Sequence, residues 1–166
     1  MQASEHHDVE PQLLAYVRQL ERNYYDWRAA HLHLSCLKPH NRRDYQLRIA
    51  AREFDGLLKK FKSELCQASN GDLFFLWHGG TFGDVDPVVL RLRYLFSDDP
   101  LANADDNLDD NPEILIAYQD SALPRPLKFC SWFDLEREYE SFCMHLDRYL
   151  EQRSQRTGAE TGTPRR

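Results

Sequence analysis

The sequence predicts an α+β domain with a ferredoxin-like, four-stranded antiparallel sheet, helices on one face and an additional N-terminal helix. Three observations predict this class. After a leading helix, the segments follow in the order strand, helix, strand, strand, helix, strand, helix. The two middle strands are joined by Ser69-Asn70-Gly71-Asp72, a strong hairpin signal. The segment before them has the apolar spacing of a helix that covers a sheet. The other sheet face is left for a ligand, a partner or the leading helix.

The length of 166 residues fits one domain, which we place at residues 10–152. We expect residues 1–9 and the tail at residues 153–166 to be disordered. The formal net charge of −6 argues against nucleic-acid binding. No segment approaches the roughly 18 apolar residues of a membrane span, and the polar start is not a signal peptide. The four cysteines form no CxxC pair. We therefore expect a cytoplasmic protein that does not bind membranes.

The leading helix is predicted over residues 11–28, with Pro11 in its first turn and apolar residues at helical spacing. Its end is aromatic, with Tyr24, Tyr25 and Trp27 close together. These rings either pack on the core of the domain or contact a partner protein or a second copy of the chain.

Residues 31–37 alternate between apolar and polar side chains, which predicts the first strand. His31 and His33 share its polar face, and His-x-His spacing can hold a metal ion, with His40 or His78 as a further ligand. No carboxylate or cysteine stands at a recognisable spacing from the pair. The sequence therefore favours half-exposed polar positions over a metal site, and it predicts no cofactor.

Residues 42–62 have the clearest helical periodicity in the chain, and their opposite face is basic. Lys38, Arg42 and Arg43 cluster just before this helix. A basic face of this kind is either simply solvated or a surface for an anion or an acidic partner.

The predicted hairpin pairs residues 65–68 with the apolar run at residues 73–77. Asn70 and Gly71 both accept the positive φ that a tight type I′ turn requires. A substitution at Gly71 is therefore expected to strain the turn.

The second half of the chain starts with a helix that we expect Asp84 or Asp86 to cap, with Pro87 in its first turn. Residues 97–126 form an acidic loop, in which residues 113–118 have the pattern of a short edge strand.

The last strand is predicted at residues 127–133 and leads into the final helix. Ser131 and Asp134 have the spacing of a capping box at the start of that helix.

Two segments carry a resemblance to a known family. Residues 33–42 read HLSCLKPHNR and resemble a DxDxFKxxND pattern, and residues 70–74 read NGDLF and resemble GGDEF. The matching residues are Leu37, Lys38, Asn41, Gly71, Asp72 and Phe74. With the order of elements, residues 30–150 resemble a degenerate GGDEF domain, the palm-like module of diguanylate cyclases.

The resemblance also implies that the family's chemistry is lost. Cyclase chemistry needs carboxylates that hold two Mg²⁺ ions. Where the family has these acids, this chain has His33, Ser35 and Leu73, and only Asp72 is left. One carboxylate cannot hold a two-metal site.

The sequence thus predicts a non-catalytic regulatory or protein-interaction domain in bacterial signalling. We expect a protein partner, of which a second copy is one form, at Tyr24, Tyr25 and Trp27. A first alternative is a sensor for an anionic nucleotide. Its ligand would contact Lys38, Asn41, Arg42, Arg43 and Asp72.

A second alternative is an RNA-binding module, since the RRM has the same strand order. Phe74, Phe75 and Trp77 lie on the third strand, and their exposure would distinguish this function. The net charge opposes it. No nucleophile–base pair or pair of carboxylates at motif spacing indicates an enzyme of another class.

Overall fold

The computed structural model describes residues 9–104, 106 and 128–162, and contains one four-stranded antiparallel sheet in the order β2-β3-β1-β4. This is the predicted ferredoxin-like order, and the α+β class is confirmed. The strands are β1 (Trp27–Leu32), β2 (Lys62–Gln67), β3 (Leu73–His78) and β4 (Cys130–Asp134). The α-helices are α2 (Val9–Gln19), α3 (Asp44–Arg52), α4 (Asp55–Lys60), α5 (Phe82–Leu95) and α7 (Leu135–Gly162).

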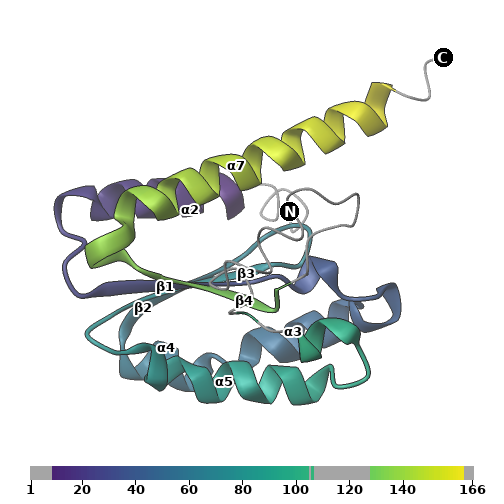
Figure 1. The fold of residues 1–166 in the computed structure, drawn as a ribbon, viewed down its shortest axis with the longest axis horizontal. Coiled ribbons are helices and arrows are strands. Elements are labelled where there is room, and N and C mark those ends of the chain that lie inside the picture. The colour runs from purple at the N-terminus through teal and green to yellow at the C-terminus, as the bar shows by residue number, and fades with distance from the viewer. Residues whose placement is uncertain (1–8, 105, 107–127, 163–166) are drawn as a thin grey trace, which may run out of the picture.

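Helices cover both faces of the sheet (Figure 1). α3, α4 and α5 lie on one face and α2 and α7 on the other. The leading helix α2 therefore covers the second face, which the sequence leaves for a ligand, a partner or this helix. The final helix α7 also packs on that face. The sheet therefore presents no bare face over its described length.

The alternation of side chains along β3 divides the core in two. Leu73, Phe75 and Trp77 point to the first face, while Phe74 and Leu76 point to the second. The first cluster is completed mainly by Ala50, Phe54, Leu57, Val85, Val89 and Leu92. The second is completed mainly by Leu13, Val17, Trp27, Leu135, Phe142 and Leu146. Both clusters exclude water from β3, which is why its run of apolar residues is continuous.

The first strand begins and ends earlier than predicted. Helix α2 and a 3₁₀ turn, η1 (Leu20–Arg22), end well before residue 28, and Asp26 takes a positive φ of 63° that directs Trp27 into β1. At the other end the chain leaves β1 after Leu32 and forms a second 3₁₀ turn, η2 (Leu34–Cys36). The predicted strand at residues 31–37 is therefore wrong beyond Leu32, because Leu34 and Leu37 are buried at the three-residue spacing of a 3₁₀ turn.

The long helix predicted over residues 42–62 is two helices. The amides of Glu53 and Phe54 bond back three residues, to Ala50 and Ala51, and this tight turn separates α3 from α4. Burial of Phe54 continues the apolar stripe across the break, so the periodicity did not reveal it. The end of the predicted helix is also wrong, since Lys62 already belongs to β2.

The hairpin between β2 and β3 is confirmed, and its register pairs Gln67 with Leu73. Its turn is not type I′, because Gly71 has a φ of 103° and Asn70 does not have a positive φ. The Gly71 amide donates to the Ala68 carbonyl at 3.0 Å, and the Ala68 amide donates to the Asp72 carbonyl at 2.9 Å. This is a three-residue loop with a bulge at the glycine.

Gly71→Val is expected to lower the free energy of unfolding by more than about 1 kcal/mol. The φ of 103° disfavours any side chain, and a Cβ would lie 3.1 Å from Leu47 Cδ1. Urea denaturation of both proteins measures the loss. Gly56→Ala is the control, since nothing lies within 4 Å of a Cβ there and alanine favours helix α4. If both variants unfold at the wild-type urea concentration, the turn does not constrain the fold.

Helix α5 is capped three residues before Asp84, the earlier of the two residues predicted to cap it. Thr81 precedes the helix, and its amide donates to Asp84 Oδ2 at 2.8 Å. Asp84 is thus the third residue of the helix, and Pro87 lies inside the helix and beyond its first turn. The predicted caps at Asp84 and Asp86 are therefore wrong, because the threonine and Asp84 already form a reciprocal pair.

The end of the chain also differs from expectation. β4 starts at Cys130, and Ser131 lies in the strand, so the proposed capping pair with Asp134 is wrong. Asp134 Oδ1 instead accepts from the Glu136 amide at 3.1 Å. Helical backbone continues to Gly162, into the segment expected to be a disordered tail. Residues 113–118, expected as an edge strand, lie outside the described residues. Within the described part of the chain, no helix is long and apolar enough to cross a membrane.

Candidate functional site

A buried cluster of histidine and aspartate side chains lies where the sheet meets α7. His31 is near the end of β1 and His33 follows that strand. Asp72 stands just before β3, and His145 lies on α7. His31 and Asp72 are each only 1% exposed. We call these four residues the histidine cluster.

The centre of the histidine cluster is a hydrogen-bonded chain. His31 Nε2 lies 2.9 Å from Asp72 Oδ2, and His31 Nδ1 lies 2.8 Å from His145 Nε2. The other carboxylate oxygen, Asp72 Oδ1, accepts from the Ser35 amide at 2.7 Å. Both ring nitrogens of His31 and both oxygens of Asp72 therefore have partners, as buried polar groups require.

His33 contacts the ring of His31 and a serine hydroxyl group. The His33 ring lies 4.0 Å from the His31 ring between centroids, and Phe74 lies at the same distance from His31. His33 Nε2 is 2.8 Å from Ser131 Oγ on β4. The histidine cluster thus touches β1, the hairpin, β4 and α7.

Burial sets the protonation of the histidine cluster. Loss of solvation lowers the pKa of His33 to about 3 and that of His145 to about 4, with repulsion from His31 adding to both shifts. Burial alone would raise the pKa of Asp72, but the hydrogen bonds from His31 and Ser35 outweigh it and lower that pKa to about 2. At neutral pH the ionised Asp72 carboxylate therefore lies in the same cluster as neutral imidazoles at His33 and His145.

His31, His33 and Asp72 together offer three ligand atoms within 4.8 Å of one another. The sequence pattern showed the two histidines but not the carboxylate, which is 41 residues from His31. The signal that could have found it is the strand order. In the order 2-3-1-4, the start of the third strand lies beside the end of the first, so the hairpin turn meets His31.

The residues predicted to bind a nucleotide are mostly engaged within the protein. Asn41 is 5% exposed and donates to Asp98 Oδ1 at 3.2 Å and to Asp99 Oδ2 at 3.0 Å. The Lys38 amide also donates to Asp99 Oδ2, at 2.7 Å. The structure thus brings Lys38 and Asn41 together around two carboxylates, which repel an anion.

The two arginines of that predicted site lie at its margin. Arg42 Nε donates to the Leu37 carbonyl at 2.7 Å, and the Arg43 amide donates to Gln46 Oε1 at 3.1 Å. Asp72, the fifth predicted residue, belongs to the histidine cluster instead. The five residues therefore do not form one anion-binding surface.

The residues predicted to bind a partner are divided between core and surface. Trp27 is 3% exposed and belongs to the second core cluster. Tyr24 stacks on Tyr139 with ring centroids 4.7 Å apart. Tyr25 is 68% exposed. Of the three, only Tyr25 keeps its ring free of the core.

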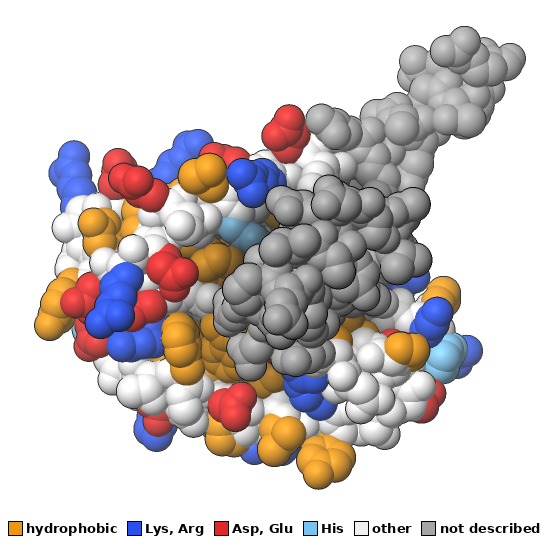
Figure 2. All heavy atoms as spheres, in the orientation of Figure 1, with side chains coloured by type: hydrophobic (Ala, Val, Ile, Leu, Met, Phe, Trp, Pro, Cys, Tyr) orange, Lys and Arg blue, Asp and Glu red, His pale blue; other side chains and the backbone are white. Residues whose placement is uncertain are grey.

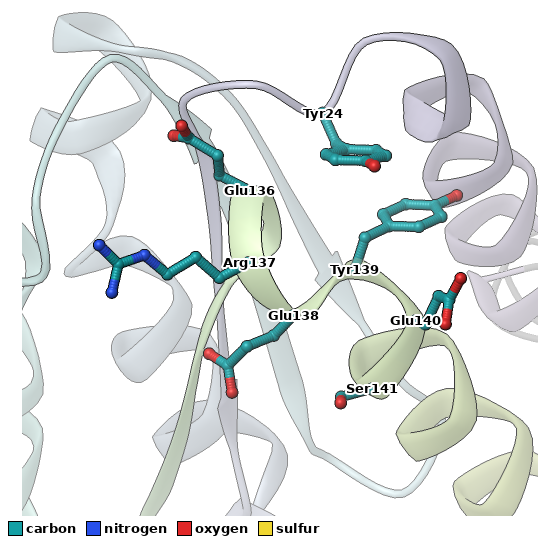
Figure 3. A pocket seen from close by; sticks show the side chains of 7 residues that line it. All are labelled: Tyr24, Glu136, Arg137, Glu138, Tyr139, Glu140 and Ser141. Atoms are coloured by element: carbon teal, nitrogen blue, oxygen red, sulfur yellow. The ribbon is translucent and has the colours of Figure 1, made fainter.

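A shallow pocket of about 290 Å³ lies beside the stacked tyrosines, where α7 is kinked at Glu138 (Figure 3). The Tyr139 hydroxyl donates to the Val17 carbonyl at 2.8 Å, so this ring anchors α2 to α7. The pocket is lined by Tyr24, Glu136, Arg137, Glu138, Tyr139, Glu140 and Ser141. Three carboxylates against one guanidinium make it unsuitable for an anionic ligand.

Comparisons of the chain with protein-family models, with curated proteins and with solved structures gave no match. The geometry and charge of the described residues are therefore the basis for assigning a function.

Proposed function

We propose that this domain is a non-catalytic regulatory module that acts in bacterial signalling by binding another protein. The observation that carries the proposal is an apolar ridge on the outer face of α5. Leu90 is 53% exposed and Tyr94 is 74% exposed. Residues four apart lie on the same side of a helix, so the two side chains form one ridge.

The surroundings of this ridge are those of a protein interface. Figure 2 shows hydrophobic side chains reaching the surface along the layer of α4 and α5. Beside the ridge, Arg91 Nε bonds to Glu53 Oε1 at 2.8 Å, which supplies a polar margin. An apolar centre with a polar rim is typical of surfaces that bind proteins.

The absence of catalysis is proposed from the histidine cluster. The two Mg²⁺ ions that the GGDEF resemblance would imply do not fit the residues present, because Mg²⁺ takes oxygen ligands and two of the nearest side chains are imidazoles. Asp72 is the one carboxylate of the cluster, and it is 1% exposed. A nucleotide would find neither two metal ions nor an open site there.

The RNA-binding alternative loses its main support. Base stacking needs aromatic rings on an exposed sheet face. Phe74 is 1% exposed, and Phe75 and Trp77 are 0% exposed. The third strand therefore offers no ring to a base.

The protein is expected not to form cyclic di-GMP from GTP in the presence of Mg²⁺ or Mn²⁺. The resembled metal positions hold His33, Ser35 and Leu73, none of which supplies a carboxylate. Chromatography of the reaction mixture detects the product, with an active diguanylate cyclase as the positive control. Metal-dependent product that Asp72→Ala abolishes would contradict the non-catalytic assignment.

The interaction surface is tested by placing a photo-cross-linking amino acid at position 94 in cells of the source organism. We expect a discrete cross-linked protein, because Tyr94 is the more exposed of the two ridge residues. Asp147 is the control position, since it is exposed on α7, across the sheet from α5. Leu90→Asp should reduce the yield at position 94 at least tenfold. Equal cross-linking at positions 94 and 147 would remove the ridge as the interface.

A further inference from the structure

Three ligand atoms come together at the end of β1, from His31, His33 and Asp72, within 4.8 Å of one another. Imidazole nitrogen and carboxylate oxygen are the ligands that Zn²⁺ and related divalent transition metals prefer. We propose that these three residues bind a divalent transition-metal ion of the Zn²⁺ type, which holds the hairpin turn against the end of β1. This site is independent of the protein-binding ridge on α5.

The distances require only a small adjustment. A tetrahedral ion with bonds of about 2.0–2.2 Å holds neighbouring ligand atoms about 3.3–3.6 Å apart. His31 Nε2 and Asp72 Oδ2 are already 2.9 Å apart. The remaining change is that the ring nitrogen of His33 must come closer to the other two ligand atoms. His33 is half-buried and follows the strand. A change in its side-chain torsions closes the set without moving the sheet.

Each proposed ligand has a partner that holds its orientation. The Ser35 amide donates to Asp72 Oδ1, which leaves Oδ2 facing His31. His145 bonds to His31 Nδ1, on the side of the ring away from the carboxylate. Ser131 bonds to His33 Nε2, which leaves Nδ1 of that ring for the ion. Supporting hydrogen bonds of this kind are a regular feature of metal-bound histidines and carboxylates.

The charges also suit a cation. The Asp72 carboxylate brings negative charge to the site, and each imidazole offers a nitrogen lone pair to the ion. In the metal-free protein the His31 Nε2–H group donates to Asp72 Oδ2, so the ion replaces this proton, which is released to solvent. Two nitrogen ligands with one carboxylate disfavour Mg²⁺ and Ca²⁺, which take oxygen.

The burial of the site indicates a structural ion. His31 and Asp72 are almost completely buried, and the half-buried His33 is the most exposed of the three ligands. Three protein ligands leave the fourth position of a tetrahedral ion to a water molecule, and the burial of two of the ligands leaves little room for a substrate there. The bound ion would connect β1 and the hairpin directly, and α7 through His145.

Zinc titration of the full chain, after removal of metal with a chelator, tests the proposal. At Zn²⁺ concentrations about a hundredfold above Kd, the Tm should rise by about 5–10 °C, and Mg²⁺ should leave it unchanged. His33→Ala should weaken Zn²⁺ binding at least tenfold in calorimetry. His40→Ala is the matched control, because the His40 side chain is 58% exposed and lies outside the cluster.

X-ray absorption of the zinc-loaded wild-type protein identifies the ligands without any variant, and remains decisive if His33→Ala does not fold. We expect two imidazoles and at least one oxygen ligand. An unchanged Tm in Zn²⁺ would overturn the proposal and leave the histidine cluster as a hydrogen-bonded chain. Equal loss of binding in the two variants, or a spectrum without two imidazoles, would overturn it as well.

Discussion

Replacing Asp72 with alanine is expected to lower the free energy of unfolding by about 3–5 kcal/mol, the largest effect of any single change considered for this protein. The carboxylate is 1% exposed and accepts from His31 and from the Ser35 amide. Alanine leaves His31 Nε2 and the Ser35 amide without these hydrogen bonds and leaves a small cavity. Urea denaturation in the presence of a chelator measures this loss apart from any contribution of a bound metal ion.

Asp72→Asn is the matched control for this change. Asparagine has nearly the same volume and keeps an oxygen that accepts from the Ser35 amide, so it should lose clearly less stability than alanine. If alanine and asparagine destabilise the protein equally, the charge rather than the hydrogen bonds supports the cluster. If neither variant is less stable than the wild type, the histidine cluster does not contribute to stability.

Gly80→Ala is expected to cost about 1–3 kcal/mol by overpacking. A Cβ at this position would lie 2.8 Å from Phe61 Cε1 and 2.9 Å from Trp77 Nε1. Trp77 is fully buried and stacks on Phe75, with ring centroids 5.4 Å apart, so it cannot move aside without disturbing the core. Thermal and urea denaturation should both show the loss.

Gly83→Ala provides the comparison, because the nearest atom to a Cβ there is Thr81 Oγ1 at an ordinary 3.5 Å. Gly83 lies inside α5, where alanine is the better helix former, so this variant should be as stable as the wild type or more so. Equal stability of the Gly80 and Gly83 variants would mean that Phe61 moves freely and that the packing around Trp77 is looser than the structure shows.

Much of the fold could be predicted from local patterns. The apolar residues of α5 and α7 recur at helical spacing, and Asn70-Gly71 marks the hairpin, because each of these signals depends on residues a few positions apart. The boundaries were less accurate. The helical pattern of residues 11–28 includes Trp27, but this residue begins β1. An aromatic residue fits both patterns, and the turn at Asp26 decides between them.

The candidate site was only half visible in the sequence. The His31–His33 spacing is visible in the sequence, but His31 bonds to a carboxylate 41 residues away and to His145, 114 residues away. Asn41 carried a predicted role in ligand binding, yet its amide is used to hold Asp98 and Asp99. The hydrogen-bond partners of His31 and of Asn41 do not stand at any regular spacing from these residues in the chain.

The sequence by itself determined the elements and their order, and hence the ferredoxin-like sheet, because helix periodicity, strand alternation and turn chemistry act over a few residues. Only the tertiary structure decided that α7 packs on the second sheet face and that Asp72 meets His31 there. These contacts join distant segments. They form because the apolar stripe of α7 must be buried against the sheet. The polar side chains on the sheet face that α7 covers, such as His31, are then buried together with it.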